Sequence, residues 1–117
     1  MKKIYYLSSC DTCQRILKEL QPLDEFKLQD IKKDPITNEQ LEGLKNLAGT
    51  YMSLFSKRAR LFRERNLNAV ELEEKDYKAL ILEHYTFLKR PVIQLDSKIF
   101  IGNSKKMIEA AKENIHP

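Results

Sequence analysis

Strand patterns in this chain of 117 residues occur only toward its two ends. Residues 3–7 form a short aromatic and β-branched run, and residues 25–31 alternate apolar with polar side chains, so both segments are predicted as strands. Residues 92–101 are predicted as an antiparallel hairpin around a tight Asp96-Ser97 turn. No strand pattern occurs from residue 32 to residue 86. The middle of the chain is therefore expected to be helical.

Helical spacing of apolar residues accounts for most of the remaining chain. Between the first two strands, Ile16, Leu17 and Leu20 share one face of a predicted helix that ends before Pro22. This helix would connect the two strands as parallel neighbours in a β-α-β unit. The order β-α-β, three helices, β-β-α indicates the α/β class. The other predicted helices are one that starts within residues 35–40 and ends at Gly49, one over about 52–65, one over 73–85, and one opened by Gly102-Asn103-Ser104.

Length, composition and charge restrict the classes of protein open to this chain. At this length, with 42% hydrophobic residues, the chain can bury one core, so residues 1–117 are predicted as a single domain. The net charge of +4 comes from 21 basic and 17 acidic residues with interleaved signs, which does not indicate nucleic-acid binding. Apolar runs are too short for a membrane span or a signal-peptide core. We therefore expect a cytoplasmic protein that contacts neither a membrane nor nucleic acid directly.

Both cysteines fall in one tetrapeptide, Cys10-Asp11-Thr12-Cys13, where the first strand gives way to the first helix. Unpaired N–H groups and the dipole at the start of a helix stabilise a thiolate. Two residues between the sulfurs allow Cys13 to attack an adduct on Cys10 and to release it as a disulfide. A Cys-x-x-Cys in a β-α-β context therefore favours redox chemistry over two inert, buried cysteines.

A zinc site is the metal alternative for these cysteines. The ligand set would be the two cysteines and the two histidines of the chain, Cys10, Cys13, His84 and His116. Structural zinc sites take their second pair of ligands from residues a few positions apart, whereas these histidines lie far apart in the sequence. The spacing therefore argues against a metal, and we interpret His84 as a half-buried helix residue and His116 as a residue of a frayed end.

Five basic residues lie within residues 57–65, and most of them fit a solvated helix face. If residues 51–65 form one helix, Arg58 and Arg65 fall on its apolar face, where a charge needs a partner. Arg58 is predicted either to reach toward the cysteine loop or to form an ion pair with a glutamate of the helical segment. Arg90 is predicted to be functional because it lies between a helix and the hairpin, at a loop mouth.

Three segments taken together resemble a known family. They are Cys10-Asp11-Thr12-Cys13-Gln14-Arg15 after the first strand, Leu54-Phe55-Ser56-Lys57-Arg58 in the central helix, and Phe87-Leu88-Lys89-Arg90-Pro91-Val92-Ile93 before the hairpin. With these motifs the chain resembles, over nearly its whole length, the family of arsenate reductases (ArsC) and Spx proteins. Cys-x-x-Cys is the form found in Spx, and no arginine follows Arg90. The chain is therefore more similar to the Spx-like branch than to arsenate reductases with the full arginine set.

The resemblance implies a fold. It implies a thioredoxin-like, or glutaredoxin-like, core with a mixed sheet, built as β-α-β and then β-β-α. This core would cover about residues 1–32 and 86–117, with an all-helical insertion over about residues 33–85. The Arg90-Pro91 peptide bond would be cis and would face the cysteine loop.

The resemblance also implies a function, that of a thiol-dependent oxidoreductase of the arsenate reductase type. Cys10 would be the nucleophile and Cys13 the resolving thiol. Arg90, together with Arg58, would stabilise an oxyanion or a thiolate, for which a planar guanidinium is well suited.

Substrate, electron donor and partner are implied in the same way. Thr12, Arg90 and Pro91 would bind a small oxyanion or a thiol substrate. No bound cofactor or metal is implied, and glutathione or a glutaredoxin would donate electrons. The alternative is an Spx-like, redox-sensing transcriptional regulator, in which the cysteine pair is a switch and the partner is RNA polymerase, bound through its α subunit.

Overall fold

The computed structural model describes residues 1–117. By its internal contacts the chain separates into two compact units, which we call the sheet unit (residues 1–34 and 90–117) and the helical unit (residues 35–89). None of the helices is both long and apolar enough to cross a membrane. In chain order the elements are β1 (Lys2–Tyr6), α1 (Asp11–Glu19), β2 (Lys27–Asp30), α2 (Asn38–Ala48), η1 (Met52–Leu54), α3 (Arg60–Glu64), η2 (Leu67–Ala69), α4 (Glu74–Glu83), η3 (Tyr85–Phe87), β3 (Val92–Leu95), β4 (Lys98–Ile101) and α5 (Lys105–Ile115).

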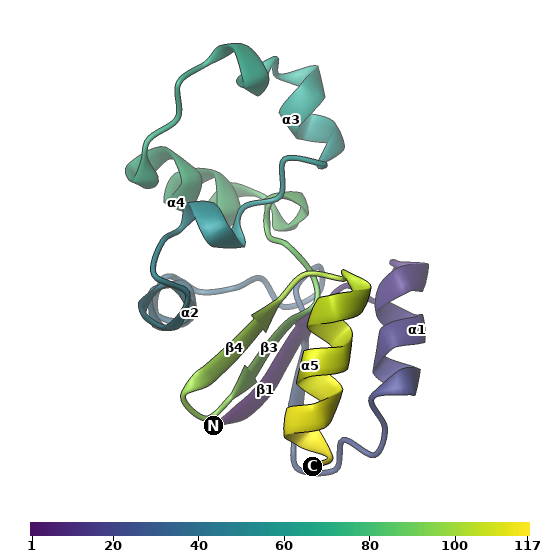
Figure 1. Ribbon diagram of the computed structural model, residues 1–117. Helices are drawn as coiled ribbons and strands as arrows, with labels where there is room; N and C mark the ends of the chain where they lie inside the picture. The colour runs from purple at the N-terminus through teal and green to yellow at the C-terminus, as the bar shows by residue number, and fades with distance from the viewer. The chain divides into compact units, whose positions relative to one another are not determined.

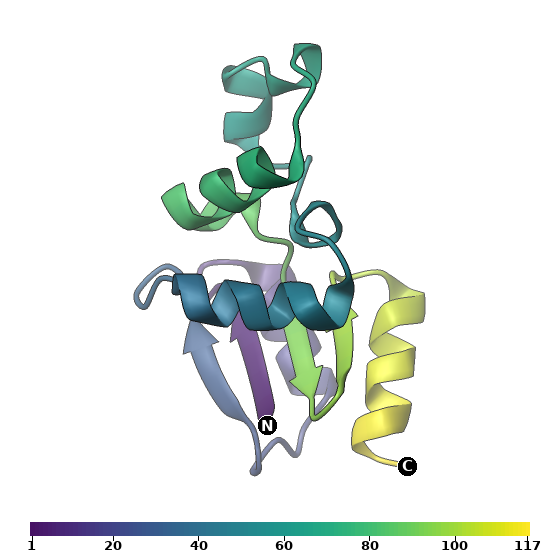
Figure 2. The same ribbon diagram turned by 90° about the vertical axis from the view of Figure 1, so that its left-hand side faces the viewer.

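The sheet unit contains one four-stranded mixed sheet with the strand order β2-β1-β3-β4 (Figure 2). Strand β1 runs parallel to β2 and antiparallel to β3, and β3 pairs with β4 as an antiparallel hairpin. The predicted α/β class and mixed sheet are therefore confirmed. Strand β2 is shorter than the predicted 25–31, because the Phe26 N–H turns back to the Leu23 carbonyl at 3.0 Å before the strand begins.

Helices α1 and α5 lie side by side on one face of this sheet (Figure 1). Their apolar stripes pack onto the side chains that β1, β3 and β4 direct to that face. Burying each large aliphatic side chain in such a core stabilises the fold by roughly 1.5–3 kcal/mol. The buried residues of this core are Ile4, Ile16, Leu17, Leu20, Leu23, Ile93, Phe100, Ile108 and Ala111.

The last helix is tied down at both ends. Ser104 is its N-cap, and the Ser104 hydroxyl accepts the N–H of Met107 at 3.2 Å, as expected for a serine in this position. At the other end the His116 ring nitrogen Nε2 lies 2.8 Å from the Leu20 carbonyl. The interpretation of His116 as a residue of a frayed end is therefore wrong, because this contact fastens the end of α5 to the end of α1.

The helical unit begins with α2, whose start matches the sequence prediction. Thr37 and Gln40 form a capping box, in which each side chain accepts a hydrogen bond from the backbone of the other residue. The helix ends at Gly49, whose φ of 96° is a conformation that favours glycine.

The predicted helix over residues 52–65 is wrong as a single element. The structure has the short η1, then extended backbone at Phe55 with φ −86° and ψ 131°, and then α3. Phe55 forms an isolated antiparallel bridge with Leu88, supported by flanking bonds from Ser56 N–H to the Phe87 carbonyl at 2.7 Å and from Lys89 N–H to the Leu54 carbonyl at 2.8 Å. These long-range backbone bonds outweigh the local helical preference.

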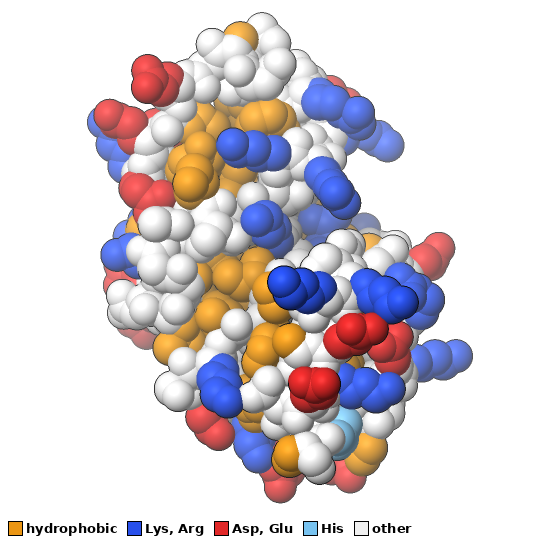
Figure 3. All heavy atoms as spheres, in the orientation of Figure 1, with side chains coloured by type: hydrophobic (Ala, Val, Ile, Leu, Met, Phe, Trp, Pro, Cys, Tyr) orange, Lys and Arg blue, Asp and Glu red, His pale blue; other side chains and the backbone are white.

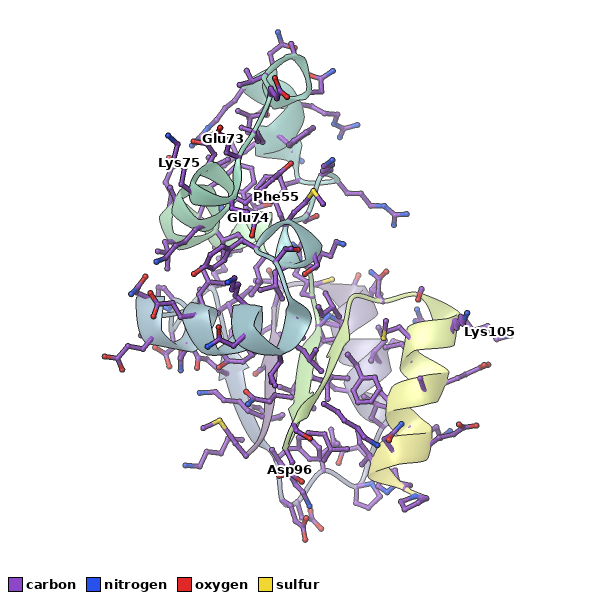
Figure 4. All side chains as sticks on the ribbon, turned by 60° about the vertical axis from the view of Figure 1, so that its left-hand side comes forward. Phe55, Glu73, Glu74, Lys75, Asp96 and Lys105 are labelled. Carbon is purple, nitrogen blue, oxygen red and sulfur yellow. The ribbon has the colours of Figure 1, made fainter.

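Extended backbone at this point places the Phe55 ring in the interior of the helical unit, as Figure 4 shows. Its ring centroid lies 5.9 Å from that of Phe62, 4.9 Å from that of Tyr77 and 5.3 Å from that of Phe87. These four aromatic residues come from η1 to η3 along the chain. The cluster therefore joins the segment after η1 to α3, α4 and η3.

Helix α4 ends at Glu83, earlier than the predicted Tyr85. Its last backbone bond runs from His84 N–H to the Leu80 carbonyl at 3.1 Å, and the His84 ring nitrogen Nδ1 then accepts the Thr86 N–H at 3.0 Å. His84 is half-buried, as predicted, but it caps two helices instead of lying inside one.

Candidate active site

Cys10 is the last residue of the tight turn that connects β1 to α1. Its N–H donates to the Leu7 carbonyl at 3.0 Å, which closes a four-residue turn. Cys10 is the N-cap residue, with extended backbone at φ −99° and ψ 113°, and its carbonyl accepts the Gln14 N–H at 3.1 Å. The sequence prediction placed the loop and the helix start at this residue, and the structure agrees. The thiol is half-buried beside the first unpaired N–H groups of the helix.

The surroundings of Cys10 lower the pKa of its thiol. Burial alone would raise this pKa, because it disfavours the charged thiolate. The backbone N–H and the thiol of Cys13 act in the opposite direction, followed by the positive charge of Arg90 and the backbone N–H of Thr12. Together these groups outweigh the effect of burial. Cys10 is therefore the more nucleophilic of the two free thiols.

Cys13 has the opposite character. It is fully buried on α1, and the pKa of its thiol is raised to about 11, with burial as the largest cause. The negative charge of Cys10 and the hydrogen bond between the two thiols contribute to this rise, whereas a backbone hydrogen bond with Leu7 and the charge of Arg90 oppose it. At neutral pH Cys13 thus keeps its proton, and Cys10 is the thiol that ionises more readily. The site therefore pairs one thiol of lowered pKa with one that donates a hydrogen bond to it.

The structure brings Arg90, Pro91 and Thr12 to the same part of the sheet unit as the cysteines. The charge of Arg90 acts on both thiols, and Thr12 lies in the first turn of α1. Pro91 is buried at the start of β3, with its carbonyl accepting the Gly102 N–H at 2.9 Å. The Arg90-Pro91 peptide bond is cis, as the family resemblance implied.

Arg58 belongs to the helical unit. The residue lies in a turn and is exposed, so its predicted place on the apolar face of a continuous helix is wrong. The reason is the interruption of that helix at Phe55, which removes the periodicity on which the prediction rested. The ion pair with a glutamate belongs to Arg65 instead, whose Nη1 lies 2.8 Å from Glu83 Oε2.

Sequence reasoning assigned no role to three residues that hold the turn before Cys10. The Ser8 N–H and hydroxyl both donate to the Asp30 carboxylate, and the Ser8 carbonyl accepts the side-chain amide of Gln14 at 3.0 Å. The available signal was modest: a serine pair at a strand-to-helix turn and an acidic residue at the end of the next strand. Neither pattern reveals that the two would meet.

The zinc interpretation has no support in the geometry. No group of three or more His, Cys, Asp or Glu side chains is placed so that it could hold a metal ion. The ring nitrogens of the two histidines are engaged with backbone groups, His84 with Thr86 and His116 with Leu20.

Replacing Arg90 is expected to change the ionisation of Cys10. Arg90→Ala removes a positive charge that favours the thiolate, so the Cys10 pKa should rise and alkylation below neutral pH should slow by about three- to tenfold. Iodoacetamide alkylation, followed from acid to alkaline pH, measures this pKa directly. Arg15→Ala is the matched control, because Arg15 is an exposed arginine of α1 that is absent from the groups acting on either thiol. An equal slowing in both variants would show that Arg90 acts only through net charge.

Comparisons with known proteins extend these observations. The model of the ArsC family matches residues 5–111. The global transcriptional regulator Spx 2 of Bacillus cereus is 26% identical over 110 residues, which cover 90% of this chain and 82% of that protein.

Solved structures are similar in fold at lower identity. An arsenate reductase from Vibrio cholerae superposes with a TM-score of 0.72 at 21% identity, covering 96% of this chain and 95% of its own. An arsenate reductase (ArsC) related protein from Brucella melitensis has a TM-score of 0.70 at 23% identity, covering 93% of this chain and 92% of its own. At these identities the likeness is one of fold, and it confirms the thioredoxin-like architecture expected from the sequence.

Proposed function

The chain belongs to the ArsC family, and from this premise we propose that it is a thiol-dependent oxidoreductase with Cys10 as nucleophile and Cys13 as resolving thiol. The observation that carries the proposal is that the pKa values of two neighbouring thiols, at the start of one helix, are shifted in opposite directions. The pKa of Cys10 is lowered and that of Cys13 is raised to about 11. Such opposite shifts in pKa are typical of a functional site and are not expected for two inert cysteines.

In the first step the Cys10 thiolate attacks the electrophilic centre of a small oxyanion. For arsenate, a bond forms between Cys10 Sγ and arsenic, and one oxygen leaves as water after protonation. Arg90 supports this step because its charge favours both the thiolate and a bound oxyanion. The N–H groups at the start of α1, among them that of Thr12, would face the same anion.

In the second step a thiol attacks Cys10 Sγ and forms a disulfide. The bond between sulfur and arsenic breaks, its electron pair stays on arsenic, and arsenite leaves, so two thiols are oxidised and arsenic is reduced by two electrons. Cys13 is suited to this role by its position. It lies in the first turn of α1, three residues after Cys10, and its thiol forms a hydrogen bond with the Cys10 thiol.

A coupled assay tests the proposal. Arsenate-dependent oxidation of NADPH is followed in the presence of glutathione, a glutaredoxin and glutathione reductase, with a thioredoxin system as the second arm. The proposal expects turnover that depends on both the protein and arsenate in the first arm. Absence of turnover in both arms, together with alkylation of Cys10 no faster than that of a model thiol, would contradict it.

A second candidate function is that of an Spx-like redox regulator that binds RNA polymerase through its α subunit. The observation that favours it is the distribution of charge. Residues 57–65 hold five of the 21 basic residues and one of the 17 acidic residues, so the rest of the chain holds sixteen of each. The entire net charge of +4 therefore belongs to this one segment around α3.

This basic segment is available for contact. Lys57, Arg58, Arg60 and Arg63 are all exposed, and Figure 3 shows Lys and Arg side chains gathered on the side of the helical unit where α3 lies. The fifth, Arg65, is held by its ion pair with Glu83. A concentrated positive patch steers association with an acidic partner surface.

Charge reversal on this segment discriminates the two functions. The double variant Arg60→Glu and Arg63→Glu is expected to weaken binding to purified polymerase α subunit by at least about tenfold, because repulsion replaces attraction. The matched control is Lys105→Glu with Lys106→Glu, an equal charge change on exposed residues of α5, where Figure 4 shows Lys105 directed away from the sheet. Interferometry measures the affinity, with a DNA duplex as a second probe. Lack of binding by the unmodified protein, reduced or oxidised, would remove the regulator function.

A further inference from the structure

The turn that connects β1 to α1 ends at Cys10, and hydrogen bonds to its second residue, Ser8, hold it in place. The Ser8 N–H donates to Asp30 Oδ1 at 3.3 Å, and the Ser8 hydroxyl donates to Asp30 Oδ2. The Ser8 carbonyl accepts from Gln14 Nε2 at 3.0 Å. Every polar group of Ser8 therefore forms a hydrogen bond, and each of these bonds is with a residue outside the turn.

The Asp30 carboxylate is itself held in place by the sheet. Asp30 is the last residue of β2 and lies opposite Tyr6, the last residue of β1. Beyond the strand, Asp30 Oδ1 also accepts the Lys32 N–H at 3.2 Å, and the Ile31 N–H donates to the Tyr6 carbonyl at 2.9 Å. The carboxylate is thus held by backbone groups at the end of β2, and through its bonds to Ser8 it constrains the turn before Cys10.

Gln14 completes the connection on the helix side. Its side chain binds the Ser8 carbonyl, and its backbone N–H donates to the Cys10 carbonyl at 3.1 Å. The turn is therefore fastened at one end to β2 and at the other to α1. Cys10 follows two residues after Ser8, so the direction of its thiol depends on how firmly this turn is held.

We propose that Asp30 is a positioning residue for Cys10: by holding Ser8 it keeps the Cys10 sulfur directed at the N–H groups that begin α1. The proposal rests on the proposed thiol chemistry of Cys10 and names a residue that supports it. Asp30 itself touches neither cysteine and acts only through the turn.

The sign of the effect separates positioning from simple electrostatics. A negative charge near a thiol raises the thiol pKa, so removal of the Asp30 charge alone would lower the pKa of Cys10. Loss of the Ser8 anchor would instead let the sulfur move away from the N–H groups of Thr12 and Cys13, and the pKa would rise. The ionisable groups that act on Cys10 are Cys13 and Arg90, and neither is altered by a change at Asp30.

Asp30 is ionised over the pH range of such an experiment. The Ser8 hydroxyl lowers the pKa of the Asp30 carboxyl, and burial, which would raise it, is outweighed with the help of the backbone N–H groups of Lys32 and Ser8 and the charge of Lys33. The anchor is therefore intact wherever the Cys10 thiol titrates.

The test is the pH profile of Cys10 alkylation by iodoacetamide, with the modified peptide identified by mass spectrometry. Asp30→Ala is expected to slow alkylation about three- to tenfold at pH values below the Cys10 pKa and to leave the alkaline plateau unchanged. Asp34→Ala is the matched control, because it removes the same charge from an exposed residue four positions away and should leave the profile unchanged.

Variants at Ser8 keep the test decisive if Asp30→Ala does not fold, which circular dichroism would reveal. Ser8→Ala removes only the hydroxyl bond and should slow alkylation below the pKa by about two- to threefold, while Ser8→Thr keeps a hydroxyl and should restore the rate. A Cys10 pKa that is unchanged or lowered in Asp30→Ala, or equal in both Ser8 variants, overturns the proposal. If Cys10 of the unsubstituted protein reacts like a model thiol, the proposed function itself has failed. That outcome differs from a reactive Cys10 whose pKa does not change in Asp30→Ala, which overturns only the role of Asp30.

Discussion

Cys10→Ser is expected to reduce arsenate-dependent turnover to background, a loss of at least about a thousandfold, because the first covalent step needs an ionised nucleophile. The groups around Cys10 lower the pKa of its thiol, whereas the pKa of a serine hydroxyl lies too far above neutral pH for the same groups to ionise it. The glutathione-coupled assay measures turnover, and intact-protein mass spectrometry reports whether any adduct forms. Turnover retained by Cys10→Ser would contradict the assignment of the nucleophile.

Cys13→Ser is the matched variant of this experiment, since it changes the second sulfur and leaves the first. A serine hydroxyl can still donate a hydrogen bond to the Cys10 thiolate, as the Cys13 thiol does. Rapid alkylation of Cys10 should therefore persist. The internal disulfide cannot form, and in the presence of glutathione Cys10 should accumulate as a mixed disulfide with one glutathione. Full turnover by this variant would show that glutathione, and not Cys13, resolves the adduct.

Phe55→Ala is expected to lower the free energy of unfolding by about 3–5 kcal/mol, the largest effect on stability that we predict. The side chain is only 1% exposed and contacts the rings of Phe62, Tyr77 and Phe87. Its removal leaves a cavity in the middle of this cluster, which the fixed backbone bridge to Leu88 cannot close. Urea denaturation, analysed by linear extrapolation, measures the loss.

Met52→Ala serves as the control for Phe55→Ala. Met52 begins the short helix η1 that precedes Phe55 and is 49% exposed, so its truncation should cost less than about 1 kcal/mol. Amide hydrogen exchange adds the location of the effect, and protection should fall first within residues 35–89. A loss below about 1 kcal/mol for Phe55→Ala would contradict the central place given to this ring.

Much of the sheet unit could be predicted because its signals are local. The switch from strand to helix at residues 8–10, the Asp96-Ser97 turn and the serine that caps α5 each depend on neighbouring residues. The same reasoning located the cysteine pair at a helix start. The contact between Asp30 and Ser8 was not predicted, because the two residues come together only when β2 pairs with β1. No local sequence pattern indicates such a contact.

The helical unit was predicted less well, because long-range contacts decide its conformation. Around Phe55 the apolar spacing fits a helix, yet backbone bonds to residues 87–89 impose an extended conformation. The error then spread to Arg58, whose predicted orientation depended on an unbroken helix. Charge composition was more robust than periodicity here, because the concentration of positive charge in residues 57–65 holds whatever conformation the segment adopts.

The sheet unit is assembled from two pieces of chain separated by the whole helical unit, and this has a consequence during protein synthesis. The ribosome releases both cysteines early, whereas Arg90 and the strands β3 and β4 follow only after residues 35–89. Until then β1 lacks its antiparallel neighbour, and the cysteines lack the cation that favours ionisation. A growing chain therefore carries a Cys10 thiol without the contribution of Arg90, and this part of the lowering of its pKa is added only once the later strands have joined the sheet.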